Sequence, residues 1–199
     1  WGMGMGVTKA TVDSYLCTDG LPISRSPLYA GDANLVNVVK NRDPRLAQSI
    51  WVPGDPVNIL GATDTTFFKR ADLHQTGSYL CVTGYQLKKH SNAWGEHLKE
   101  NYYQSQIGSI LFRYAEALLN YAEARAELGE INQSDIDLTI NKLRDRVGMA
   151  RLQLGNITND PQWDYPSLSP IINEVRRERR VELAVENSKI YRRRRRNRK

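Results

Sequence analysis

Trp94 is the residue best suited to bind a ligand, because it stands among small polar residues in the run SNAWGE (residues 91–96). A tryptophan in such a run has no apolar neighbours to pack against locally, so we expect it on a loop. The flat face of an indole packs against the C–H face of a sugar ring, while polar groups around it bind the hydroxyls. These residue types are therefore compatible with carbohydrate binding.

Other aromatic residues are candidates for the same chemistry. Tyr102 and Tyr103 follow closely, with amide side chains on both sides, and Trp51 precedes a turn rich in proline and glycine. Trp163, which follows another proline, is a weaker candidate. We predict Trp94, Tyr102, Tyr103 and Trp51 as ligand-binding residues. The alternative is that each ring covers the core, and this alternative is strongest for Trp51 and Trp163.

Patterns typical of catalysis or of a bound cofactor are missing from the sequence. The histidines, His74, His90 and His97, lack the His-Glu-x-x-His spacing of a metal site, and no Cys-x-x-Cys pair is present. The glycines at 2, 4 and 6 are spaced as in a dinucleotide loop, but no predicted strand precedes them. We therefore predict no catalytic residue, no metal ligand and no cofactor.

Positive charge is concentrated at the C-terminus. The chain has 199 residues and a net charge of +6, and seven positive charges lie in the last eight residues, 192–199. The rest of the chain is nearly neutral. An arginine-rich tail favours phosphate binding, but no basic face accompanies it, so we expect no nucleic-acid partner. We predict that residues 192–199 form a basic tail that is disordered or non-native.

The composition is that of an ordinary globular domain, with 40% hydrophobic and 25% charged residues. No apolar run is long enough for a transmembrane helix. No secretion signal opens the sequence, so any targeting signal is expected outside it. Cys17 and Cys81 allow either one disulfide bond or two free thiols.

The second half of the chain is predicted to be helical. From Gln106 to Leu128 apolar residues recur at helical spacing, and Gly129 follows where a helix-ending glycine belongs. Ser134, with Asp137 three residues later, is predicted to open a second helix that ends at Gly148. The short connection makes these two helices an antiparallel pair.

A third helix is predicted to start at Ser169-Pro170, a cap followed by a first-turn proline. Four glutamates recur along it at i,i+4 spacing, and like charges at that spacing destabilise a lone helix. We therefore expect arginine partners on an adjacent helix, either Arg144 or Arg146. The glutamates are Glu174, Glu178, Glu182 and Glu186.

The first half of the chain is predicted to be loop-rich, with short helices. One helix is expected from Thr8, as its N-cap, to Leu16. Another is expected from Asp43-Pro44 to about Trp51. Residues 78–88 have the composition of a strand.

Three runs of the second half together resemble the SusD/RagB family. Residues 112–124, FRYAEALLNYAEA, are very similar to the family helix RYAEVLLNYAEA. Residues 140–149, INKLRDRVGM, look like its following helix IN-x-LR-x-RVGM. Residues 178–184, ERRVELA, look like the family helix of that sequence. The order and the spacing also match.

Two further family landmarks lie upstream, VDSY at 12–15 with Asp19-Gly20, and NRDPRL at 41–46. The resemblance covers roughly residues 1–186 and corresponds to an internal and C-terminal stretch of a considerably longer protein. It ends after Glu186, where the family commonly continues with glycine and an aromatic-rich segment.

The resemblance implies a fold and a domain organisation. We expect an all-α fold, mainly helical with tetratricopeptide-like αα-hairpin packing, long loops and minor β structure. Residues 1–191 would form the family's C-terminal region, loop-rich over 1–104 and helical over 105–191, before the tail at 192–199.

The resemblance also implies a non-catalytic lipoprotein at the surface of the outer membrane in Bacteroidetes-type bacteria. Its lipid anchor would lie outside this sequence. It would bind an oligosaccharide, or sometimes a peptide, and deliver it to a TonB-dependent, SusC-like transporter.

Two alternatives remain open from the residues. A helical-repeat adaptor would bind another protein, or nucleic acid through its basic tail. A glycoside-acting enzyme would need two carboxylates that face each other across a cleft, and no motif indicates them.

Overall fold

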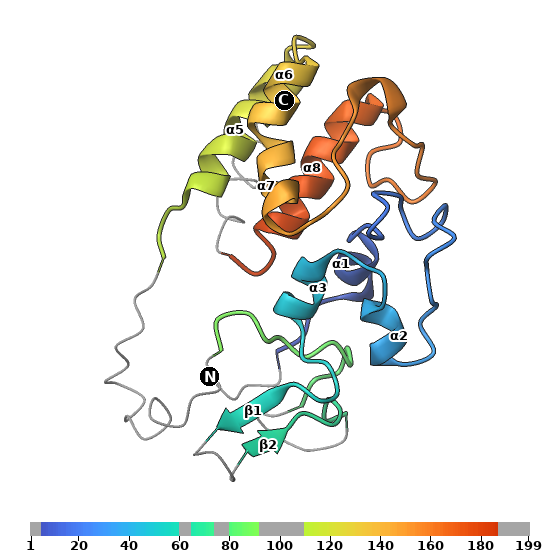
Figure 1. Ribbon diagram of the computed structural model, residues 1–199, viewed down its shortest axis with the longest axis vertical. Coiled ribbons are helices and arrows are strands. Elements are labelled where there is room, and N and C mark those ends of the chain that lie inside the picture. The colour runs from blue at the N-terminus through green and yellow to red at the C-terminus, as the bar shows by residue number, and fades with distance from the viewer. Residues whose placement is uncertain (1–4, 60–64, 74–79, 92–109, 187–199) are drawn as a thin grey trace.

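The chain is mainly helical, as predicted. The computed structural model describes four parts of it, residues 5–59, 65–73, 80–91 and 110–186. The helices are α1 (Lys9–Asp13), α2 (Leu35–Val39), α3 (Pro44–Ser49), α5 (Tyr114–Glu127), α6 (Gln133–Leu138), α7 (Ile140–Arg146) and α8 (Pro170–Glu182), with a 3₁₀ turn at Leu154–Asn156 and strands β1 (Pro56–Ile59) and β2 (Thr65–Phe67). Figure 1 shows α5–α8 gathered in one half of the molecule, with α1–α3 next to them and the strands beyond.

Helix α5 begins later than the apolar periodicity predicts. Residues 110–113 are not helical, and Arg113, the N-cap residue, has an extended backbone with φ −141°. This backbone directs the Arg113 side chain to Glu182 and Glu186 at the end of α8, with which it forms ion pairs. The predicted start at Gln106 lies outside the described residues. The predicted end is confirmed, since Gly129 follows with φ +71°.

The second helix of the predicted pair is capped by a different residue and is broken in two. Asn132, and not Ser134, is its N-cap, and a capping box joins Asn132 to Asp135. Thr139 interrupts the helix and separates α6 from α7, because its hydroxyl donates a hydrogen bond of 2.6 Å to the carbonyl oxygen of Asp135. Gly148 ends α7 as predicted, with φ +69°.

The helices of the second half share one packed interior. Helix α5 packs along α8, and α6 and α7 pack against α5. Alanines on α5 allow this close approach, with isoleucines of α6 and α7 opposite them. The buried cluster consists of Ala122, Ala126, Ile136, Ile140, Leu152 and Val175, and a neighbouring one of Ala115, Leu118, Leu119, Leu143 and Leu183.

Helix α5 also carries a second apolar stripe on its outer face. Tyr114, Tyr121 and Leu128 recur every seven residues and are 67%, 45% and 69% exposed. Seven residues are nearly two helical turns, so the three side chains lie on one side. A helix that is apolar on two sides is typical of helical-repeat arrays, in which each helix has neighbours on both sides.

The short helices of the first half begin where the sequence predicts. The Thr8 side chain accepts a hydrogen bond from the backbone of Thr11 at the start of α1. Asp43 caps α3, with Pro44 in its first turn.

The prediction of a strand at 78–88 is wrong for residues 80–88, which are the part of this run that the structure describes. Gln86 and Leu87 form only isolated bridges, to Gly6 and Ile50. Gly84, with φ +74°, turns the chain within this run, so no continuous ladder forms. The two-stranded antiparallel sheet instead pairs β1 with β2.

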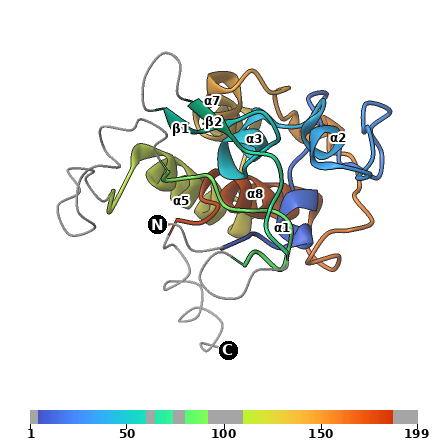
Figure 2. The same cartoon turned by 90° about the horizontal axis from the view of Figure 1, so that it is seen from below.

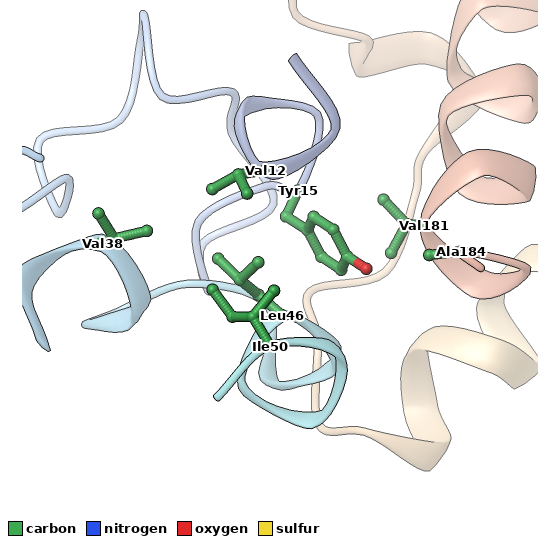
Figure 3. Close-up of a cluster of buried hydrophobic side chains, with 7 residues drawn as sticks. All are labelled: Val12, Tyr15, Val38, Leu46, Ile50, Val181 and Ala184. Carbon is green, nitrogen blue, oxygen red and sulfur yellow. The ribbon is translucent and has the colours of Figure 1, made fainter. Parts of the chain in front are cut away.

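The two halves of the chain meet on α8. Figure 3 shows Tyr15 lying between the residues of the first half and those at the end of α8. Its hydroxyl lies 3.0 Å from the hydroxyl of Ser49. The cluster consists of Val12, Tyr15, Val38, Leu46, Ile50, Val181 and Ala184.

The sequence left open whether Cys17 and Cys81 form a disulfide bond. Both are buried, and their thiols are free. In the described parts of the chain, no helix combines the length and apolarity that crossing a membrane requires.

Candidate functional site

The glutamate row of α8 is the centre of a buried ion-pair network. Glu178 is 2% exposed. Its carboxylate accepts hydrogen bonds from Arg45 Nη1 at 2.6 Å and from Arg144 Nε at 2.9 Å. Arg45 in turn pairs with Asp43, the N-cap of α3. One carboxylate therefore holds α3 and α7 against α8.

Glu182, one turn further along α8, extends the network. It accepts hydrogen bonds from Arg45 at 2.8 Å, from Arg113 at 2.5 Å and from Arg146 at 2.8 Å. The predicted partners Arg144 and Arg146 are thus both confirmed as ion-pair partners of the row. Arg45 and Arg113 were missed, because they come from segments far away in the sequence.

The network changes the acidity of its own groups. Burial alone would raise the pKa of Glu178, but Arg45 and Arg144 outweigh it and hold that pKa below its usual value. The pKa of Glu182 is lowered in the same way by Arg113 and Arg45. These carboxylates are therefore charged at neutral pH and fix the orientation of α8.

The other face of α8 lines a cleft of about 210 Å³, which we call the Trp163 cleft. Its opposite walls are α1 and the loop that precedes α8, and Figure 2 shows this loop passing beside α1. The lining residues are Ala10, Asp13, Ser14, Asp160, Gln162, Trp163, Asp164, Tyr165, Asn173, Arg176, Arg177 and Arg180.

Asp160 fixes the start of the cleft loop. Its carboxylate accepts hydrogen bonds from the backbone of Gln162 at 3.0 Å, from the hydroxyl of Ser24 at 3.1 Å and from Arg177 Nη2 at 2.5 Å. The carbonyl oxygen of Asp160 also accepts a hydrogen bond from the backbone N–H of Trp163. The loop is therefore tied to the first half of the chain and to α8.

Two aromatic rings are oriented by α8. The indole N–H of Trp163 donates to Glu174 Oε1 at 3.4 Å. The guanidinium of Arg176 lies 4.4 Å from the centre of the Tyr165 ring. Asn173 holds the same tyrosine by donating a hydrogen bond of 2.9 Å to its carbonyl oxygen.

The charged groups of the cleft are arranged in pairs. Arg180 forms an ion pair with Asp164. Asp13 forms one with Lys9 at 2.9 Å. Arg177, whose side chain is 8% exposed, lies between Asp160 and Glu174, with its Nη1 atom 3.3 Å from the carboxylate of Glu174. The cleft thus combines flat rings with planar polar groups that both donate and accept hydrogen bonds.

The structure places Trp51 away from this cleft. Its ring is 7% exposed and stacks on Phe68, with 6.0 Å between ring centres. It occupies a small buried cluster, which is the core role that sequence reasoning gave as the alternative. Trp94, Tyr102 and Tyr103 lie outside the described residues, and their part in binding stays a prediction.

Trp163, which sequence reasoning ranked as a weaker candidate, lines the cleft, whereas Trp51, the other tryptophan that the structure describes, does not. The cleft arginines on α8 were not predicted as site residues. The sequence feature that could have indicated them is the polar loop around Trp163, because it comes shortly before a helix with arginines at 176, 177 and 180.

Fold and cleft together define a helical scaffold that presents a ligand-sized recess beside one long helix. The sequence model of the SusD family matches residues 1–198, and the chain belongs to this family.

Solved structures agree with this membership. A SusD-like protein from Bacteroides fragilis is 25% identical, with a TM-score of 0.61 over 94% of this chain and 35% of that one. A SusD-like carbohydrate binding protein from the same organism is 25% identical, with a TM-score of 0.59 over 92% and 34%. The chain spans about a third of the length of these relatives. No curated protein matches it significantly.

Proposed function

We propose that the chain is part of a non-catalytic protein that binds oligosaccharide, and that the Trp163 cleft contributes to the binding site. The observation that carries this proposal is the combination of Trp163 and Tyr165 with planar, hydrogen-bonding side chains in one recess. Such a combination suits a sugar, which has apolar C–H faces and a polar edge. Membership of the SusD family supports it.

The ion pairs of the cleft favour binding over hydrolysis. Glycoside hydrolysis needs one carboxyl group that is protonated as the acid and a second as base or nucleophile. Asp160 is paired with Arg177, and Asp164 with Arg180. Both carboxylates are therefore already engaged by guanidinium groups of α8.

The same proposal includes the cellular role. The protein would be anchored by lipid in the outer membrane, at the cell surface, and would pass its ligand to a TonB-dependent, SusC-like transporter. Family membership supports this role. Co-purification of such a barrel with the tagged full-length protein from outer membranes tests it, and recovery of the protein from the soluble fraction alone would contradict it.

Changing Trp163 to Ala is expected to weaken the binding of a neutral oligosaccharide at least tenfold. The substitution removes the largest flat surface of the cleft, and a tenfold loss corresponds to about 1.4 kcal/mol. Calorimetric titration measures it, with chromatography of the sugar to show that none is cleaved. Phe112→Ala is the matched control, because Phe112 is an aromatic residue that is 77% exposed and does not line the cleft.

Equal affinities of the Trp163→Ala variant and the unchanged chain would exclude the cleft as a binding site. A loss confined to Trp94→Ala would instead place binding at the aromatic loop predicted from the sequence. Both variants need a circular dichroism spectrum like that of the unchanged chain.

A further inference from the structure

We propose that the Trp163 cleft accepts one uncharged pyranose unit and discriminates against sugars that carry a carboxylate. This inference rests on the proposed function and adds the class of ligand. It depends on the size of the cleft and on how its charges are already paired.

The small volume of the cleft favours a single ring. Pockets that enclose drug-sized ligands usually have volumes of about 300–1,000 Å³. The Trp163 cleft has about 210 Å³, which is below that range. We therefore expect one unit of a chain to enter, while the remaining units stay outside.

Each arginine of the cleft already has a carboxylate partner. Arg177 is held by Asp160 and Glu174, Arg180 by Asp164, and Arg176 by Glu127, the last residue of α5. An acidic sugar would have to displace one of these carboxylates in order to pair with a guanidinium. The displaced carboxylate of the protein would then lie near the carboxylate of the sugar, and like charges close together are unfavourable.

The exposed carboxylates of the cleft reinforce this selection. The side chains of Asp13 and Asp164 are 23% and 43% exposed. Both line the cleft, so their charge faces an incoming ligand. A uronate would meet this charge directly, whereas a neutral hydroxyl can donate a hydrogen bond to either group.

A neutral sugar does not compete for the arginines. A hydroxyl hydrogen can donate to a carboxylate oxygen, and the hydroxyl oxygen can accept from a guanidinium N–H. Hydroxyls can therefore join the existing ion pairs without breaking them.

The rings have different roles in this arrangement. The guanidinium of Arg176 already lies over the Tyr165 ring. We therefore assign Trp163 as the ring that stacks on the C–H face of the sugar, and Tyr165 as the residue that positions Arg176.

The test compares matched neutral and acidic sugars. The unchanged chain is titrated with methyl β-pyranosides in the gluco, galacto and manno configurations, each beside the corresponding methyl uronide, and binding is followed by NMR. We expect the neutral member of the best-binding pair to bind at least tenfold more tightly. The Asp164→Asn variant should reduce this preference severalfold, because it removes a negative charge that lines the cleft.

Asp145→Asn is the matched control. Asp145 is 44% exposed and pairs with Arg151, much as Asp164 pairs with Arg180, but it does not line the cleft. This variant should keep the full preference. A uronide that binds as tightly as its neutral partner would overturn this inference and leave the proposed function in place. If no sugar of either series binds, both proposals fall.

Discussion

Replacing Glu178 with Ala is expected to lower the free energy of unfolding by about 3–5 kcal/mol, because it leaves two buried guanidinium groups without their shared partner. The Arg45 and Arg144 side chains are only 6% and 2% exposed, so water cannot replace the lost carboxylate. Since small domains are stable by about 5–15 kcal/mol, a large part of the total would be lost. Urea unfolding followed by circular dichroism measures this change.

Glu130→Ala is the control for this substitution. Glu130 forms an ion pair with Arg125, but its side chain is 57% exposed. Exposed pairs contribute about 0–1 kcal/mol, so this variant should unfold almost like the unchanged chain. Similar losses for the two variants would show that the buried network does not hold α3 and α7 against α8.

Acidification is expected to destabilise the fold through the same groups. The pKa values of Glu178 and Glu182 are lowered in the folded chain, since their arginine partners outweigh the effect of burial. A carboxylate with a lowered folded pKa contributes its full stabilisation above its unfolded pKa, about 4.3 for Glu. That contribution is lost as the pH falls through the folded pKa.

Urea midpoints measured between neutral pH and about pH 3 test this expectation. They should fall little near neutral pH and steeply below the unfolded pKa of Glu. The Glu178→Gln variant should start lower and fall less steeply, because it has one carboxylate fewer to protonate. The same slope in both proteins would contradict the role given to Glu178.

Local patterns in the sequence predicted most of the helices and the partners of the glutamate row. The i,i+4 spacing predicted four carboxylates in one row, and this row required cations from a neighbouring helix. Three of the four lie on α8, whereas Glu186 follows its end. Arg144 and Arg146 meet that requirement. Arg45 could not be predicted in this way, because it lies 133 residues from Glu178 in the sequence and no local pattern relates the two segments.

The N-cap residue of α6 was predicted wrongly for a different reason. Asn132 and Ser134 are both good N-cap residues, and each has an aspartate three residues later. The pattern therefore fits two starting points. The observed start buries Ile136 and Ile140 against α5, so tertiary packing decides between them.

The candidate binding residues were the least predictable part. Trp51 and Trp163 look alike in sequence, since each lies two residues from a proline in a polar loop. Phe68 covers Trp51, whereas the loop tied to Arg177 presents Trp163 at a cleft. Both outcomes depend on contacts with distant residues, and a local pattern does not contain them.

We propose that Trp163 contacts the sugar, and the indole N–H signals of the chain test this contact directly. The sequence has four tryptophans, so each indole can be followed separately in a ¹H–¹⁵N spectrum and assigned by single Trp→Phe variants. On titration with the best-binding neutral sugar, we expect a saturable shift of the Trp163 signal, while the buried Trp51 signal stays in place. A Trp163 signal that does not move at saturating sugar would contradict it.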